Sequence, residues 1–167
     1  MPPYMRSRLV IFANPDVDPL GAGYNVIQAT ISVGSGGLTG RGFLSGTQSQ
    51  LHYLRVQYAD FIFAVLAEEL GFLGALFLFV LFGLLLYRAL RAAFLSSEPF
   101  GRLVAVGVIS MLAFQFFVNV GMNVGLLPVT GIPLPFISFG GTSLVTVMAS
   151  IGILESIVMR HRRFELF

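Results

Sequence analysis

Long runs of apolar residues alternate with short polar segments over the second part of the chain. The apolar runs cover residues 59–87, 102–127 and 142–159. The charge-free part of the first run, Leu70 to Tyr87, alone approaches the roughly 20 residues that cross a bilayer core. This pattern predicts an all-α integral membrane protein, a polytopic bundle with three transmembrane helices in this chain.

Proline and glycine interrupt the pattern in residues 128–141, between the second and third apolar runs. These residues are Pro128, Gly131, Pro133, Pro135, Gly140 and Gly141. Proline removes a backbone donor and clashes with the preceding turn, so three prolines this close exclude a continuous helix. Irregular backbone cannot face lipid, because its polar groups would lack hydrogen-bond partners. We therefore expect residues 128–141 to form a re-entrant loop at a membrane face or along a cavity walled by protein.

Residues 1–58 are the least hydrophobic part of the chain and are expected to form a large loop outside the lipid. Within this loop, the apolar positions from Tyr24 to Gly34 fit a short helix and a strand about equally well. The run from Gly34 to Gly42 resembles a phosphate-binding loop, but it lacks the lysine of one such motif and the spacing of the other. A flexible turn is the better interpretation. The polar start, Met1 to Arg8, is not typical of a signal peptide, so we expect the chain to begin midway through something larger.

Arginines indicate the orientation of the predicted helices. They are Arg88, Arg91 and Arg102, in and beside residues 88–101, and Arg160, Arg162 and Arg163, in residues 160–167. Two spans separate the clusters, so both fall on one side, which the positive-inside rule identifies as cytoplasmic. Residues 1–58 and 128–141, together with Asp60, are then expected on the outer face. The net charge of +2 and the pI near 9.4 follow the membrane and indicate no nucleic-acid partner.

Composition supports the membrane assignment and removes several classes of site. Hydrophobic residues make up 56% of the chain and charged residues only 11%, whereas a soluble domain carries about a quarter charged residues. All 10 basic residues are arginine, which excludes a phosphate-loop lysine and a Schiff-base lysine. The absence of cysteine excludes disulfides and thiolate sites. His52 and His161 fall on opposite sides of the predicted membrane, so they cannot share a metal ion. No cofactor is evident, and a requirement for a divalent cation stays open.

Polar residues recur within the second predicted helix. Gln115, Asn119 and Asn123 are four residues apart and therefore share one stripe. The stripe can hydrogen-bond to neighbouring helices, at about 0.6 to 2 kcal/mol for each side chain, or it can line a hydrated substrate cavity. The two interpretations are compatible. Gly121 and Gly125 form a G-x-x-x-G pattern, which is typical of a close-packing surface.

Carboxylates mark the predicted outer end of the first helix. Asp60 is the only aspartate after residue 18. It can be an N-cap or first-turn acid that complements the helix dipole, or a functional carboxylate beside the polar head of a membrane-bound substrate. Glu68 and Glu69 are functional candidates because carboxylates in membrane segments are costly. An ion pair to a helix outside the chain explains this glutamate pair equally well.

Two segments resemble the signature of the bacterial shape, elongation, division and sporulation family. The first contains an asparagine, G-L-x-P, a glycine and an apolar residue, two further apolar residues, and a form of S-Y-G-G followed by small residues. Its matching positions are Asn119, Gly125, Leu126, Pro128, Gly131, Ile132, Phe136, Ile137, Ser138, Gly140, Gly141, Thr142 and Ser143. The second is D-F-I-F-A-V-L-A-E-E-L-G, from Asp60 to Gly71. Upstream, G-T-Q-S-Q-L and G-A-G-Y are similar to the rod-shape branch of the family rather than the division branch.

The chain departs from the family pattern at two places. Phe139 replaces the usual tyrosine, which removes one hydroxyl. Leu54 to Asp60 reads L-R-V-Q-Y-A-D, where the family usually has L-P-E-x-H-T-D. The missing proline, glutamate, histidine and threonine leave the geometry of the loop before Asp60 open.

The resemblance implies a bundle of ten transmembrane helices, of which this chain corresponds to the last three and the outer loop before them. It implies a peptidoglycan glycosyltransferase that polymerises lipid II at the outer face of the cytoplasmic membrane with a class B penicillin-binding protein. Asp60 matches the family's proposed catalytic aspartate and would act as a general base. The substrate-binding candidates are Arg41, Arg55, Ser138, Gly140, Gly141, Asn119 and Asn123. Of these, the two arginines and the amides at Gly140 and Gly141 would stabilise a lipid diphosphate leaving group.

Two other functions fit the same pattern. In a lipid II flippase or transporter, the polar stripe and the interrupted helix would form a translocation path. A non-catalytic scaffold that recruits the penicillin-binding protein would make Asp60 dispensable. Location discriminates between the first two functions, because a flippase needs charge deep in the bundle and a polymerase needs a carboxylate at the outer face.

Overall fold

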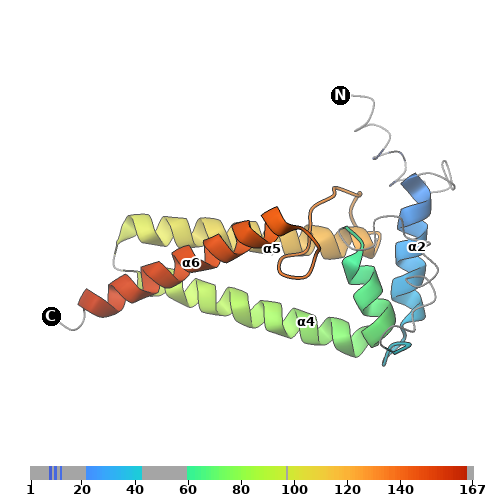
Figure 1. Cartoon of the computed structure of the whole chain (residues 1–167), viewed down its shortest axis with the longest axis horizontal. Helices are drawn as coiled ribbons and strands as arrows, with labels where there is room; N and C mark the ends of the chain where they lie inside the picture. Colours follow the sequence, from blue (N-terminus) through green and yellow to red (C-terminus); the bar gives the residue numbers. More distant parts are fainter. Residues whose placement is uncertain are drawn as a thin grey trace.

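The structure, a computed structural model, describes residues 8, 10, 12, 22–42, 60–96 and 98–164. The regular elements in these ranges are helices, namely α2 (Ala22–Ser35), α4 (Ile62–Leu95), α5 (Pro99–Asn123) and α6 (Gly141–Phe164). Figure 1 shows α4, α5 and α6 running together as a long bundle, while α2 lies across one end of it. The predicted all-α fold is confirmed for the part of the chain that the structure describes.

Three helices have the length and apolar character needed to cross a membrane. They are α4, α5 and residues Gly141–Met159 of α6. Large apolar side chains such as Phe77, Leu103 and Val145 are exposed along them. A helix that is hydrophobic all round is typical of a membrane span, where lipid or other helices cover such side chains. The three predicted transmembrane helices are therefore confirmed, although their ends differ from the predicted ones.

The connection between α4 and α5 is shorter than expected. Helix α4 continues past residue 87 to Leu95, so Arg88 and Arg91 lie in its last turns and not in a loop. Only residues 96–98 separate it from α5. Helix α5 begins at Pro99, where the missing N–H of proline would have had no helical partner.

The other end of α5 is set by a glycine turn. The helix ends at Asn123, because Gly125 has φ 75° and turns the chain back. The amides of Leu126 and Leu127 then bond to the carbonyl of Gly121 at 2.8 and 3.2 Å. In the part of the chain that the structure describes, the G-x-x-x-G pattern therefore closes the end of α5, and its Gly125 also lies near α2, where a Cβ would be 3.7 Å from Thr30 Oγ1.

Helix α4 is broken at Gly71, which has φ 67° and ψ −163°. This backbone conformation is open to glycine and strained for other residues. The break divides α4 into an outer segment, residues 62–70, and a span, residues 72–95. In Figure 1 the outer segment lies beside α2, while the span runs into the bundle. The expected uninterrupted helix over residues 59–87 is not what the structure shows.

The turn that follows α2 fills the break. Four backbone hydrogen bonds join the turn to α4. Two run from the turn, where the amides of Arg41 and Gly42 donate to the carbonyls of Glu68 and Glu69 at 3.0 and 3.1 Å, respectively. The other two run from α4, where the amides of Phe72 and Leu73 donate to the carbonyls of Gly37 and Leu38 at 2.9 and 3.1 Å. The backbone groups that lose their helical partners at Gly71 are thereby satisfied. The glycine-rich run is a turn, as predicted, but a docked one with a structural role.

Helix α2 packs along the outer segment of α4. Ala29 is fully buried against Phe61 and Ala64. Seven residues further on, Gly36 touches the carbonyl of Ala67, where a Cβ would not fit. The sequence left helix and strand open for residues 24–34, and this packing on a neighbouring helix settles the choice.

The loop between α5 and α6 enters the core of the bundle. Its Leu134 is 1% exposed. The cluster around this side chain comprises Phe63, Phe82, Leu112, Phe116 and Val147. Within it, Phe82 and Phe116 stack with their ring centroids 4.1 Å apart. Leu134 and Pro135 are therefore irregular backbone packed inside the bundle, whereas Phe136 and Phe139 of the same loop are exposed. The expected re-entrant position of residues 128–141 at a membrane face stays a prediction.

Candidate functional site

Asp60 lies immediately before α4, at the end of the bundle where α2 lies. The N-cap residue of α4 is Phe61, and the helix has no side-chain cap from that residue. Asp60 therefore precedes the capping position, and the N-cap interpretation of this carboxylate is wrong. Its side chain is only partly buried.

Two buried asparagines hold the main chain of Asp60. The Nδ2 amides of Asn119 and Asn123 donate to its carbonyl oxygen at 3.2 and 3.1 Å. Both asparagines are completely buried. The side-chain amides of both residues donate to backbone carbonyls. The geometry therefore favours hydrogen bonding within the protein as the role of the stripe, rather than the lining of a hydrated substrate cavity. Gln115, the third member, is only partly buried, and its Oε1 has no hydrogen-bond partner in the described residues.

The Asp60 carboxylate faces the loop between α5 and α6. A Cβ built on Gly131 would lie 3.7 Å from Asp60 Oδ2, so the glycine leaves space beside the carboxylate. Arg8 also reaches this place, where its guanidinium donates to the carbonyl of Val129 at 2.7 Å. Burial raises the pKa of the Asp60 carboxyl above 3.8, and the Arg8 charge partly offsets this effect. The site thus combines a carboxylate of increased basicity with a nearby cation.

Arg8 was not among the site residues predicted from the sequence. This arginine lies far from Asp60 in the chain and belongs to no recognisable sequence pattern. Its role depends on the fold that brings residues 8, 60 and 129 together. Only its charge, in a chain whose other arginines mostly follow the membrane, could have drawn attention to it.

Of the two predicted arginines, the structure describes Arg41, and it places this residue away from Asp60. The backbone amide of Arg41 bonds to the carbonyl of Glu68, and its Nε donates to the carbonyl of Ser35. Glu68 lies about 12 Å along the helix from Asp60, so Arg41 is anchored away from the carboxylate. Arg55 lies outside the described residues. The Glu68 side chain is fully buried, where α4 meets the docked turn.

The candidates in the loop before α6 have structural contacts. Ser138 Oγ accepts from the amide of Leu134 at 2.7 Å, and the Ser138 amide donates to the Leu134 carbonyl at 3.0 Å. The carbonyl of Gly140 accepts a hydrogen bond from the amide of Leu144 at 2.9 Å, and Gly141 is the first residue of α6. These residues shape the loop that presents Gly131 to Asp60, and substrate binding by them stays a prediction.

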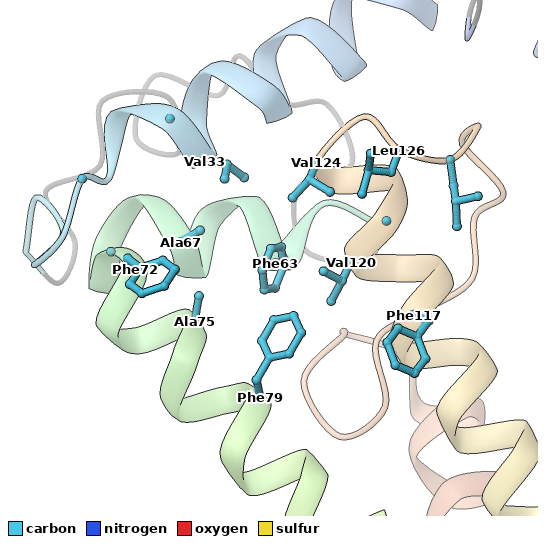
Figure 2. A pocket seen from close by; sticks show the side chains of 15 residues that line it. Val33, Phe63, Ala67, Phe72, Ala75, Phe79, Phe117, Val120, Val124 and Leu126 are labelled. Carbon is cyan, nitrogen blue, oxygen red and sulfur yellow. The ribbon is translucent and has the colours of Figure 1, made fainter.

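An apolar pocket of about 710 Å³ lies beside the break in α4. Figure 2 shows Phe63, Phe72 and Phe79 of α4 around it, with Val33 of α2 and Phe117 of α5. Its described lining holds no charged side chain. Phe63, three residues after Asp60, brings the pocket close to the candidate site.

Metal ligands do not gather in the described part of the chain. No group of three or more His, Cys, Asp or Glu side chains there could hold a metal ion. His52 and the side chain of His161 lie outside the described residues.

Comparison with known proteins places the chain in a family. The model described as "Cell cycle protein", for FtsW, RodA and SpoVE, matches residues 1–163. "Peptidoglycan glycosyltransferase MrdB" of Escherichia coli K12 is 51% identical over 160 residues, which are 96% of this chain and 43% of that protein. "Peptidoglycan glycosyltransferase RodA" of Treponema pallidum is 47% identical over 95% of this chain and 37% of its own length.

A solved structure agrees with this assignment. The structure titled "Structural coordination of polymerization and crosslinking by a peptidoglycan synthase complex" matches with a TM-score of 0.75 and 35% identity, over 97% of this chain and 43% of that one. The chain therefore spans less than half the length of these relatives. It is a multi-pass protein of the bacterial cytoplasmic membrane, and it belongs to the FtsW, RodA and SpoVE family that its sequence resembles.

Proposed function

We propose that this chain supplies the catalytic carboxylate of a peptidoglycan glycosyltransferase that polymerises lipid II during cell-wall elongation and shape maintenance. The names of the Escherichia coli and Treponema pallidum relatives support this activity. Because those relatives are more than twice as long, the activity belongs to a complete bundle to which this chain contributes helices and one face of the site.

The proposal rests on the hydrogen bonds and surroundings of Asp60. Its main chain is fixed by Asn119 and Asn123, while its carboxylate is not used as a helix cap and lies beside Gly131. Burial raises the pKa of this carboxyl, which makes the ionised form a stronger base. A general base of this kind gains from a pKa closer to the working pH.

The proposed step is a single displacement at an anomeric carbon. A sugar hydroxyl of one lipid II molecule attacks the anomeric carbon of the glycan chain, and Asp60 accepts the hydroxyl proton. The new glycosidic C–O bond forms as the C–O bond to the lipid diphosphate breaks, so the diphosphate leaves with the bonding electrons and the configuration inverts. One base with inversion needs a single carboxylate at this position.

The leaving diphosphate needs positive charge, and Arg8 is the described cation at the site. Its guanidinium is held at the loop by the Val129 carbonyl and acts on Asp60 through its charge. Arginine binds phosphate oxygens through a planar set of donors. We therefore propose Arg8 for this role in place of Arg41, while Arg55, outside the described residues, stays a candidate.

The partner we propose is a class B penicillin-binding protein. The matched structure is titled a peptidoglycan synthase complex that coordinates polymerization and crosslinking. A polymerase that works beside a crosslinking enzyme would be expected to assemble with one in the same membrane.

The test uses a full-length chimaera in which residues 1–163 replace the matching part of Escherichia coli MrdB. Asp60→Asn keeps the size of the side chain but removes its charge and most of its basicity. Polymerisation of purified lipid II, with the partner present, should fall about 10² to 10⁴-fold. Glu98→Gln, at an exposed carboxylate between α4 and α5, is the matched control and should polymerise normally.

Binding and transport assays separate the alternatives. Lipid II binding and partner binding should survive Asp60→Asn, because neither needs the proton transfer. Near-normal glycan product from a well-folded Asp60→Asn chimaera would refute the catalytic assignment. Lipid II transport by the chimaera without polymerisation would favour a flippase instead.

A further inference from the structure

The hydrogen bonds of Asn119 and Asn123 converge on one residue. Both Nδ2 groups donate to the same acceptor, the carbonyl of Asp60, at 3.2 and 3.1 Å. The two side chains are also joined, since Asn123 Nδ2 lies 3.3 Å from Asn119 Oδ1. Both residues are 0% exposed, so water does not compete for these groups. A carbonyl that receives two buried donors is fixed more firmly than one that receives a single bond.

Asn123 also caps the helix that follows Asp60. Its Oδ1 accepts the amide of Ala64 at 3.2 Å, in the first turn of α4. The N-cap residue Phe61 has no side chain that could do this. An asparagine from α5 thus replaces the local cap and fixes where α4 begins.

Asn119 ties the facing loop to the same point. Its Nδ2 also donates to the carbonyl of Ile132 at 2.8 Å. Ile132 follows Gly131, the residue beside Asp60 Oδ2. The side-chain amide of Asn119 therefore positions the loop relative to Asp60, whose carboxylate faces that loop.

We propose that Asn119 and Asn123 are positioning residues, which orient the Asp60 carboxylate for proton transfer and bind no substrate themselves. This inference rests on the proposed function. It predicts that their loss lowers turnover and leaves substrate affinity largely intact, because a displaced base slows the chemical step.

Gln115 provides a matched control on the same helix stripe. It lies two turns from Asn123, and its Oε1 has no partner in the described residues. A general polar role for the stripe would give all three side chains similar importance. The geometry instead restricts the effect to the two asparagines.

The experiment measures kcat and KM for lipid II in the chimaera with Asn119→Ala, Asn123→Ala and Gln115→Ala. The asparagine variants should lose about 10- to 100-fold in kcat, with KM within about threefold. Gln115→Ala should stay within about twofold of the parent in both constants. Asn119→Ser and Asn123→Ser, whose hydroxyl can keep one donor, should lie between alanine and parent.

The pH profile separates positioning from simple loss of folded protein. Loosening the main chain admits water to the carboxylate, so the acid limb of the kcat profile should move to lower pH in the asparagine variants. Arg8, the charged group described beside Asp60, is unchanged in these variants and acts in the same direction. A loss of folded enzyme would scale the whole profile and leave the limb in place.

Several outcomes would overturn the inference. Parent-like kcat and an unmoved acid limb in both alanine variants would do so, and so would a rise in KM that accounts for the whole defect. Failure of the alanine and serine variants alike to fold would leave a purely structural role. An active Asp60→Asn chimaera would instead refute the proposed function, so the two failures are distinguishable.

Discussion

Gly40 and Gly71 meet back to back at the break in α4, and neither position has room for a side chain. A Cβ on Gly71 would collide with the amide of Gly40, and a Cβ on Gly40 would collide with the carbonyl of Glu69. Both glycines have positive φ, 76° and 67°. The direction of the outer segment, which begins beside Asp60, is thus fixed by a turn from a distant part of the chain.

The first prediction concerns this contact. Backbone strain alone at a positive φ costs about 1 to 3 kcal/mol. Gly71→Ala in the chimaera should lower the free energy of unfolding by more than this, because the collision with Gly40 adds to the strain. The matched control is Gly83→Ala in the same helix, where a Cβ meets nothing within 4 Å. That change should be neutral or stabilising by roughly 0.5 to 1 kcal/mol. Equal melting temperatures for the two variants would contradict the close approach.

Much of the fold follows from the sequence because its causes are local. A run of apolar residues longer than a bilayer core requires a spanning helix, so α4, α5 and α6 were predictable. Three prolines likewise excluded a helix over residues 128–141. The break at Gly71 was not predictable, because glycine is tolerated in membrane helices and the turn that stabilises the break comes from another part of the chain.

The site was predictable only in part, for the same reason. The four-residue spacing of Asn119 and Asn123 predicts a shared face. It does not reveal that their acceptor is the Asp60 carbonyl, which only the packing of α4 against α5 brings near. Arg8 and Val129 meet through a contact between distant segments, and no local pattern encodes it.

The second prediction concerns the loop that enters the core. Leu134→Ala should cost about 2 to 5 kcal/mol of unfolding free energy, because the side chain is 1% exposed among aromatic rings and its loss leaves a cavity. Leu126→Ala, at a leucine of the same loop region that is 73% exposed, should cost much less. Thermal melting of the two purified variants is the measurement. A mild effect at Leu134 would mean that the loop does not pack inside the bundle.

The third prediction concerns topology. Single cysteines at Ser49 and Thr130 should react with an impermeant thiol reagent in intact cells, and one at Ser97 should react only after permeabilisation. The expectation follows from the arginine distribution and the positive-inside rule. The unsubstituted 167-residue chain has no cysteine and is the blank. Labelling at Ser97 alone would invert the orientation and place Asp60 on the cytoplasmic side.

The fourth prediction concerns completeness. The 167-residue chain expressed alone should not polymerise lipid II, because its relatives are more than twice as long. The apolar faces of α4 and α5 are exposed, and we expect further helices of a complete bundle to cover them. Co-expression with the upstream part of MrdB should restore activity if the two parts assemble. Full activity of the purified chain by itself would show that the additional helices are dispensable.

The last prediction follows from the partly buried carboxylate of Asp60 and separates stability from catalysis. Burial raises the pKa of Asp60 above 3.8, so between 3.8 and the raised pKa the folded protein keeps a proton that the unfolded chain has released. The contribution of this group to the free energy of unfolding therefore falls as the pH rises through that window. Asparagine stays neutral, so the Asp60→Asn chimaera should melt at a higher temperature than its parent at neutral pH, with the difference shrinking as the pH approaches 3.8. Melting curves over this pH range, with Glu98→Gln as the exposed control, make the comparison.

Greater stability of Asp60→Asn together with lost polymerisation is the result expected if the carboxylate serves catalysis and lowers the stability of the fold. A parent that is more stable than Asp60→Asn at neutral pH would show that Asp60 serves the fold instead.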